Sequence, residues 1–245
     1  MNIKYRPEID GLRALAVLSV IFYHAQIKIN GNQLLAGGYL GVDIFFVISG
    51  YLITSLIYSR LQNRDFSFLY FYERRIRRIV PALVIVISIS MICSWYILLP
   101  YSFIDFSKSA ISSIFFSSNF YFWLTGQDYA SENSLLIPLI HTWSLSVEEQ
   151  YYIFFPLIFL LFFKFFKNYL TIIFLTIIFL NLLLIQFSGN LKFSYPFIED
   201  NFRLNAPSVF FDFYFLSSRI WELFAGSILV FIEKKDIFKN KFSNL

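Results

Sequence analysis

An arginine and a histidine stand eleven positions apart in the first apolar stretch of the chain, at Arg13 and His24. At about 100° per residue, eleven residues return a helical side chain to within about 20° of the same face, with an axial separation of about 16 Å. Histidine exchanges protons near neutral pH and can also act as a nucleophile. A long, thin substrate could therefore touch both side chains. A snorkelling arginine and a histidine hydrogen-bonded between helices would explain the same spacing without chemistry.

Two carboxylates, Asp43 and Glu148, could assist such a histidine. Asp43 lies near the start of the second apolar stretch, where it could orient an imidazole or simply favour the start of a helix. Glu148 follows His141 by seven residues in HTWSLSVEEQYY, so the two share a helical face within about 20°, whereas Glu149 points about 80° away. Ionisable groups in a membrane cost free energy to insert, so we expect these carboxylates to have partners or a function.

Two further groups of charges stand out. The segment YERRIRRIVPA carries four arginines, Arg74, Arg75, Arg77 and Arg78. Guanidinium groups bind phosphate oxygens in pairs, so this segment could hold a polyphosphate. Ordinary cytoplasmic charge or a contact with anionic lipid would explain it equally well. Later in the chain, Arg219 and Glu222 are three residues apart, and we expect them to form a structural ion pair on one helix face.

The elements that must position these residues are apolar. Hydrophobic residues make up 58% of the 245-residue chain and charged residues only 15%, which is well below the charged share of a soluble domain. A membrane span needs about 20 apolar residues. The candidate spans are residues 11–29, 38–58, 79–99, 139–163, 169–187 and 216–232. The serine-rich run 107–124 is ambiguous.

Lysine and arginine clusters precede the first span, separate the second from the third, and follow the fourth and the last. If 107–124 does not cross the membrane, the positive-inside rule places all of these clusters in the cytoplasm; if it crosses, the later clusters move outside. We therefore predict an all-α, polytopic bundle of about six transmembrane helices with one re-entrant or surface helix. It would lie in the cytoplasmic (inner) membrane with a cytoplasmic N-terminus.

The domain organisation is simple. We expect one membrane domain over residues 1–245, which ends in a basic segment directly after a span and so continues in a longer parent protein. The lone cysteine, Cys93, allows no intrachain disulfide, and the usual zinc spacings are absent. We expect no metal, no tightly bound cofactor and no nucleic-acid partner.

Five segments together resemble the acyltransferase 3 family of membrane acyltransferases. In chain order they are YRPEIDGLRALAVLSVIFYHA, GGYLGVDIFFVISGYLIT, FYERRIRRIVPAL, HTWSLSVEEQYYIFFP and SSRIWELFAGSIL. Each motif is modest alone, but five in this order over nearly the whole chain are specific. Members of the family usually have more spans than the six predicted here.

The resemblance implies an activity. The family moves an acyl group, most often acetyl, from cytoplasmic acyl-CoA to a hydroxyl of an extracytoplasmic carbohydrate such as lipopolysaccharide O-antigen, exopolysaccharide or peptidoglycan. The partners would be acyl-CoA as donor, a carbohydrate acceptor and the lipid bilayer. His24 would act as the general base or would carry the acyl group itself, and the sequence leaves both routes open.

The resemblance also implies residue roles. The catalytic group would be His24, Arg13, Glu148 and Asp43. The acyl-CoA would be bound by Arg74, Arg75 and Arg78 together with Arg13. The acceptor would be bound by His141, Trp143, Ser144 and Glu149.

A different class of protein would share many of these features. A transporter or flippase of an envelope glycan precursor also carries intramembrane histidine, arginine and glutamate. Such proteins usually show inverted repeats or helices broken near the midplane in both halves, and the sequence has no such pair. A non-catalytic scaffold would explain the spans, but it would not explain polar groups that recur on shared helical faces.

Overall fold

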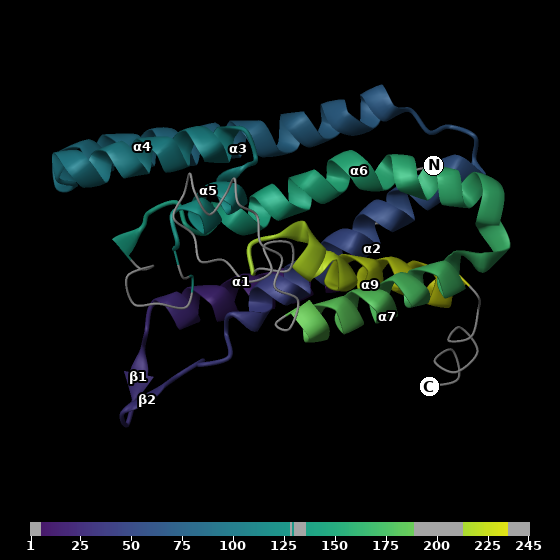
Figure 1. Cartoon of the computed structure of the whole chain (residues 1–245), viewed down its shortest axis with the longest axis horizontal. Coiled ribbons are helices and arrows are strands. Elements are labelled where there is room, and N and C mark those ends of the chain that lie inside the picture. The colour runs from purple at the N-terminus through teal and green to yellow at the C-terminus, as the bar shows by residue number, and fades with distance from the viewer. Residues whose placement is uncertain (1–5, 128, 130–135, 189–212, 235–245) are drawn as a thin grey trace. The chain divides into compact units, whose positions relative to one another are not determined.

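The computed structural model describes residues 6–127, 129, 136–188 and 213–234 (Figure 1). These residues are almost entirely helical. The helices are α1 (Pro7–His24), α2 (Leu40–Gln62), α3 (Phe68–Ile97), α4 (Pro100–Ile114), α5 (Ser118–Leu124), α6 (Thr142–Phe166), α7 (Leu170–Ser188) and α9 (Leu216–Lys234), with a 3₁₀ turn at Lys167–Tyr169. They divide into two compact units: residues up to Arg64, Leu157–Gln186 and from Arg219 onward form the first, and Asp65–Pro156 with Phe187–Ser218 form the second.

Each of the six predicted spans corresponds to a helix, which confirms the all-α prediction. Three stretches of the described chain are long and apolar enough to cross a membrane: Leu40–Gln62, Phe68–Ile97 and Thr142–Phe187, the last covering α6 and most of α7. Helices α1 and α9 fall short of this measure because charged residues such as Arg13 and Glu222 interrupt their apolar runs. The structure therefore supports a helical membrane protein, and the count of six spans stays a prediction.

In the first unit, α1 and α2 form an antiparallel helical hairpin. Two glycines allow the close approach. A Cβ on Gly38, two residues before α2, would overlap the backbone of Ser19, and a Cβ on Gly41, in the first turn of α2, would overlap that of Ala16. The connection contains the strands β1 (Lys28–Ile29) and β2 (Asn32–Gln33), which pair antiparallel. Asn30 and Gly31 both have positive φ (52° and 83°), as the primed two-residue turns of β-hairpins require.

Helix α9 packs against α2 in the same direction. Asp43 contacts Arg219 early in both helices, Thr54 hydrogen-bonds Ser227 at 2.7 Å further along, and Tyr58 meets Phe231 edge-on near their ends. Figure 1 shows the two helices side by side. If all six predicted helices cross the membrane, this parallel packing requires that 107–124 does not cross, because a further crossing would reverse α9 relative to α2.

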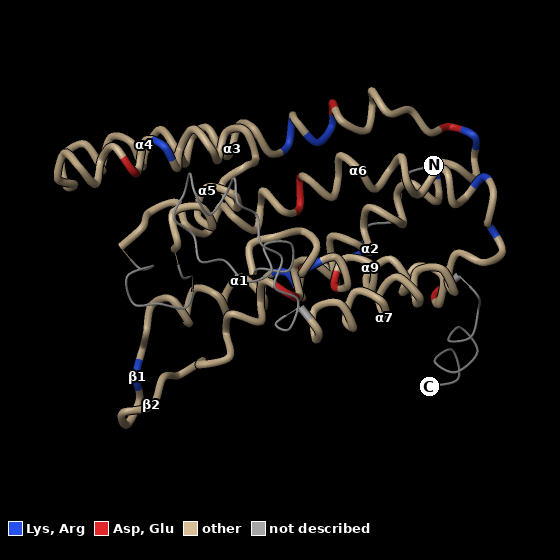
Figure 2. The backbone as a smooth tube through the Cα atoms, in the orientation of Figure 1, with Lys and Arg blue, Asp and Glu red and all other residues tan. Residues whose placement is uncertain are grey.

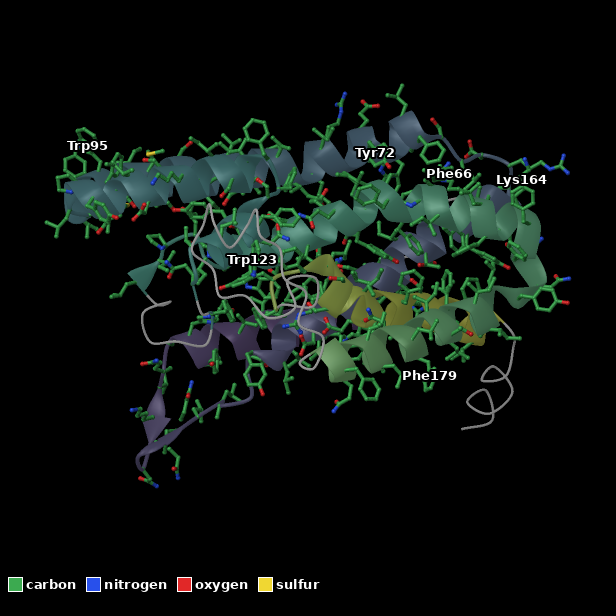
Figure 3. The ribbon with its side chains drawn as sticks, in the orientation of Figure 1. Phe66, Tyr72, Trp95, Trp123, Lys164 and Phe179 are labelled. Atoms are coloured by element: carbon green, nitrogen blue, oxygen red, sulfur yellow. The ribbon has the colours of Figure 1, made fainter. Side chains whose placement is uncertain are left out.

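Charged residues gather at one end of the first unit. Arg6, just before α1, hydrogen-bonds Glu8, Tyr51 and Glu233, so α1 begins where α9 ends. Its hydrogen bond to Glu8 raises the pKa of Arg6, which keeps this anchor charged. The basic turn from α6 into α7 (Lys164 in Figure 3, blue bands in Figure 2) lies at this same end, because the ring of Tyr58 near the end of α2 meets that of Phe163 edge-on. Of the last predicted lysine cluster, Lys235, Lys239 and Lys241 lie outside the described residues.

In the second unit, α3 is the longest helix. Its 30 residues span about 45 Å, which matches a bilayer with its interfacial regions. Figure 3 shows Tyr72 toward its start and Trp95 near its end, the two levels where interfacial aromatic residues are favoured. The helix begins eleven residues before the predicted span at 79, so the arginine motif is helical and Pro81 lies in the helix interior rather than at its start.

The ambiguous run 107–124 is not one helix. After α3, the chain reverses at Leu98–Leu99 into α4, which packs back along α3 around Leu83, Ile87 and Phe106. Helix α4 ends at Ile114, Phe116 adopts a positive φ of 51°, and the short α5 follows. With 15 and 7 residues, α4 and α5 are each shorter than the length that a span requires.

The close contact of α2 with α9 generates a stability prediction. A Cβ on Gly50 would overlap the backbone carbonyl of Leu223, so Gly50→Ala must push the two helices apart. We expect a loss of about 1–3 kcal/mol in unfolding free energy, measured by thermal unfolding in detergent micelles.

Gly11 in α1 is the matched control for this substitution. A Cβ there meets nothing within 4 Å, so Gly11→Ala should be neutral or should stabilise by up to about 1 kcal/mol through helix propensity. A Gly50→Ala protein as stable as the Gly11→Ala protein would contradict the packing described here.

Candidate active site

Arg13 and His24 flank the contact of α1 with α2. Ala16 is buried in that contact. Relative to Ala16, helical geometry turns Arg13 by about 60° and His24 by about 80° in the same sense, so both lie on one side of the helix–helix contact. Asp43, two residues beyond Gly41, stands at an axial level between them. The shared face predicted from the sequence is therefore compatible with the packing.

His24 is the last residue of α1. It therefore lies where the helix passes into the loop with β1 and β2 that connects α1 to α2. Its Nδ1 lies 2.9 Å from the carbonyl oxygen of Val20. A carbonyl only accepts hydrogen bonds, so Nδ1 carries the proton and Nε2 carries the lone pair of the neutral ring. The Tyr23 ring packs edge-on against the imidazole at 5.2 Å between centroids. This contact and the hydrogen bond hold the ring in one orientation.

Asp43 pairs with an arginine from the last helix. Nη1 of Arg219 lies 3.3 Å from Oδ1 of Asp43 and 3.1 Å from Oε1 of Glu222. The side chains of Arg219 and Glu222 are only 16% and 1% exposed, and Oε2 of Glu222 is buried without a hydrogen-bond partner. One guanidinium thus holds two carboxylates in an apolar part of the unit.

The sequence predicted only the local half of this cluster. Arg219 and Glu222 are three residues apart, and their pairing is confirmed. The bond from Arg219 to Asp43 joins residues 176 positions apart, so no local spacing could reveal it. The sequence offered one signal for this contact. Asp43 and Arg219 are both ionisable residues near the start of an apolar helix, where such residues need a partner.

In the second unit, the two glutamates of the EEQ segment have different surroundings. Glu148 accepts a hydrogen bond of 3.3 Å from the hydroxyl of Tyr152, one turn later in α6. Glu149 is 8% exposed, and its Oε1 is buried without a hydrogen-bond partner. The sequence ranked Glu148 above Glu149 as a functional carboxylate, whereas burial singles out Glu149.

Arg75 joins the arginine motif to these glutamates. Its guanidinium lies 4.4 Å from the centroid of the Tyr152 ring and attracts the Glu149 carboxylate electrostatically. Tyr72 donates a hydrogen bond of 2.8 Å to the carbonyl of Ile153, which holds α3 against α6 at this level. Two motifs that are over 70 residues apart in the sequence therefore meet at one place.

The other arginines of the motif point elsewhere. Arg77 forms an exposed ion pair of 2.8 Å with Glu73. Arg74 and Arg78 are exposed and one turn apart, on one face of α3, with Arg74 also over the ring of Tyr70. Figure 2 shows the blue and red bands of α3 in its first turns and a tan second half. Arg74 and Arg78 are thus the pair that a soluble phosphate could reach.

The predicted acceptor-binding residues divide into surface and core. His141 is exposed in the turn before α6, and Ser144 is half-buried in its first turn. Trp143 is 1% exposed and packs among Tyr129, Phe213 and Tyr214, with its ring 4.6 Å from that of Phe213. Trp143 therefore positions the start of α6 as a core residue, and a contact with substrate stays a prediction.

Sequence reasoning missed a buried hydroxyl cluster that links three helices. The Thr142 hydroxyl lies 2.8 Å from that of Ser113 and 3.0 Å from that of Ser118. Ser118 in turn lies 2.8 Å from Ser146, and Gln150 donates to Asn119 one turn further along. These groups satisfy one another's hydrogen bonds, so they fix α6 against α4 and α5. The serines of the run 107–124 could have indicated this hydroxyl cluster only if their partners on α6 had been known.

A family model described as an acyltransferase domain matches residues 6–242. The chain belongs to this acyltransferase family. The match confirms the family expected from the five motifs, and no solved structure matches the chain.

Two relatives of this acyltransferase-family chain carry specific names. The O-acetyltransferase OatA of Staphylococcus aureus is 42% identical over 156 residues, which are 63% of this chain and 25% of that protein. The peptidoglycan O-acetyltransferase OatA of Listeria monocytogenes is 40% identical over 166 residues, 67% of this chain and 26% of that protein. The chain thus spans about a quarter of the length of these relatives.

The shared guanidinium of Arg219 generates a prediction of energetic coupling. Removing one member of a buried ion pair leaves its partner uncompensated, so Asp43→Asn and Arg219→Gln should not be additive. A double-mutant cycle on unfolding free energy should give a coupling of about 0.5–3 kcal/mol.

The exposed pair Glu73–Arg77 serves as the control cycle. Its coupling should stay at or below about 0.5 kcal/mol, because solvent screens both charges. Equal coupling energies in the two cycles would contradict the prediction that the Asp43–Arg219 pair contributes more to stability than an exposed ion pair.

Proposed function

We propose that this chain is an integral membrane O-acyltransferase. It moves an acetyl group from cytoplasmic acetyl-CoA to a hydroxyl of an extracytoplasmic glycan, of which peptidoglycan is the first candidate. The observation that carries the proposal is the family match over residues 6–242, together with relatives that are named O-acetyltransferases. The proposal includes a cytoplasmic-membrane location with the N-terminus in the cytoplasm.

The donor would bind at the basic end of α3. CoA carries several phosphate charges, and arginine binds phosphate oxygens through paired, charge-assisted hydrogen bonds. Arg74 and Arg78 are exposed there on one helix face, and Arg75 beside them borders Glu149 and Tyr152. The pantetheine arm is narrow enough to enter between helices. Within the first unit, Arg13 and His24 lie on one side of α1, so an arm that contacts Arg13 would also reach His24.

His24 would perform the transfer. Because Nδ1 donates to the Val20 carbonyl, Nε2 is the basic nitrogen. Nε2 takes the proton of the acceptor hydroxyl, whose oxygen attacks the thioester carbonyl. The C–O bond forms, the C–S bond breaks, and the CoA thiolate takes the proton from the imidazolium. In the second route, Nε2 attacks the thioester and the acceptor hydroxyl then releases the acetyl group from the ring.

The carboxylates would support this chemistry. Asp43 stands between the levels of Arg13 and His24, and its negative charge would favour the imidazolium that forms during transfer. Glu148 would position substrate groups beside the motif, and Glu149 would balance the charge of Arg75. The chemistry as drawn needs no metal, because the imidazole alone handles the proton.

The test is acetyl transfer in membranes that contain this chain. Radiolabelled acetyl-CoA and envelope glycan are supplied, and alkali-labile label on the glycan is measured. We expect His24→Ala to reduce transfer by at least about 100-fold, because a positioned base or nucleophile contributes that much or more. Arg13→Ala should also reduce transfer strongly.

Cys93→Ser is the matched control. Cys93 is exposed on α3 and is the only cysteine of the sequence, so it is the only side chain whose acylation would give a thioester. The proposal predicts full activity for Cys93→Ser. Retained transfer by His24→Ala would sink the mechanism. Glycan movement across the membrane without acetyl-CoA consumption would favour a flippase instead.

A further inference from the structure

The second unit contains a cavity of about 530 Å³ between α4, α5 and the segment just before α6. This volume is within the usual range for small-molecule sites. Its polar lining comprises Tyr101, Ser102, Asp105, Ser109, Tyr121, Thr125 and Gln127. Leucine, isoleucine, proline and phenylalanine side chains supply the apolar remainder. Nothing in the proposed donor site or in the transfer step uses this cavity.

The cavity lies at the end of α3 that is opposite the arginine motif. Leu98, which lines the cavity, directly follows α3, whereas Arg78 lies in its first half. Twenty residues of helix separate them, or about 30 Å, which equals the thickness of the hydrocarbon core. If the arginines face the cytoplasm, the cavity opens on the extracytoplasmic side.

The lining suits a hydroxyl-rich ligand. Asp105 presents a half-buried carboxylate, which accepts hydrogen bonds from hydroxyl groups. The Tyr121 hydroxyl donates 3.1 Å to the backbone carbonyl of Asp105, so its own lone pairs point to other donors. A sugar ring offers hydroxyl groups at its edge and C–H groups on its faces, which match the polar and aromatic parts of this lining.

The same lining disfavours an anionic ligand. None of the described residues that line the cavity is lysine or arginine, and Asp105 adds a negative charge. Lys108 pairs with Asp105 from the exposed surface at 3.4 Å and is not part of the lining. The phosphates of CoA or of a lipid headgroup would meet no positive charge in the described lining, and the nearby Lys108 is paired with Asp105.

We propose that this cavity binds the glycan acceptor of the acyl transfer. The inference rests on the proposed function and assigns the acceptor to residues outside the five motifs that carry the family resemblance. It separates donor and acceptor by the thickness of the bilayer. Asp105 is the residue that recognises the acceptor hydroxyl groups, and Ser102 stands at the exposed side of the cavity.

The test measures the KM for each substrate separately, with the full chain in liposomes. The donor is labelled acetyl-CoA, and the acceptor probe is a soluble tetramer of N-acetylglucosamine. Asp105→Asn should raise the acceptor KM roughly tenfold, because a charge-assisted hydrogen bond becomes a neutral one. Ser102→Trp, which fills the cavity, should abolish saturation with acceptor. Neither change should alter the KM for acetyl-CoA.

Two control variants make the result specific. Ile104→Trp places the same bulk at an exposed position of α4 that does not line the cavity, so the acceptor KM should stay unchanged. Arg74→Ala with Arg78→Ala should give the reciprocal pattern, a higher KM for acetyl-CoA and an unchanged acceptor KM. An unchanged acceptor KM in Ser102→Trp would overturn the proposal.

A binding measurement separates this proposal from the proposed function. If wild type transfers no acetyl group, the proposed function fails, and binding of a fluorescent N-acetylglucosamine tetramer to the purified chain decides about the cavity. Binding by wild type and by Ile104→Trp, but not by Ser102→Trp, would support it. No binding by wild type, or equal binding by all three proteins, would overturn it.

Discussion

An ionisable side chain in an apolar interior must be held by a partner, and this constraint decides where the charged residues of this chain stand. Arg219 is held by Asp43 and Glu222, a contact that fixes α9 beside α2. Arg75 stands over the Tyr152 ring and beside Glu149, at the level where Tyr72 fastens α3 to α6. In both units the charged residues therefore mark the places where helices from distant parts of the sequence meet.

The same constraint separates the two ends of α3. Its arginines lie in the first turns, where water and anionic groups can reach them, and the helix then continues without charge to Ile97. Under the proposed function, a helix of this length would place the proposed phosphate-binding end and the proposed hydroxyl-binding end on opposite sides of a bilayer. The proposed acyl transfer would need this separation, because its donor would be cytoplasmic and its acceptor extracytoplasmic.

Periodicity and composition predicted the helices and much of the local geometry. The six apolar runs are helices, and the face shared by Arg13 and His24 fits the contact of α1 with α2. The parallel direction of α2 and α9 agrees with the topology that the lysine and arginine clusters favoured. The helices themselves were predictable because helix formation depends on interactions within one segment and on the cost of moving charge through lipid. The topology and the roles of Arg13 and His24 stay predictions.

What the sequence could not predict depends on partners that are distant in the chain. The Asp43–Arg219 pair, the meeting of Arg75 with Glu149 and the hydroxyl cluster around Thr142 all join separate segments. The run 107–124 was predicted as one helix, but Phe116 takes a positive φ and divides it into α4 and α5. The third span was predicted to begin at residue 79, but α3 extends back over the arginine motif to Phe68.

The central claim is that donor and acceptor meet this protein from opposite sides of the membrane. Sealed vesicles of known orientation, loaded with glycan in the lumen and given labelled acetyl-CoA outside, test it most directly. The account predicts labelled lumenal glycan only when the cytoplasmic face points outward, and no labelling in right-side-out vesicles. Equal labelling in both orientations, or labelling only in right-side-out vesicles, would contradict it.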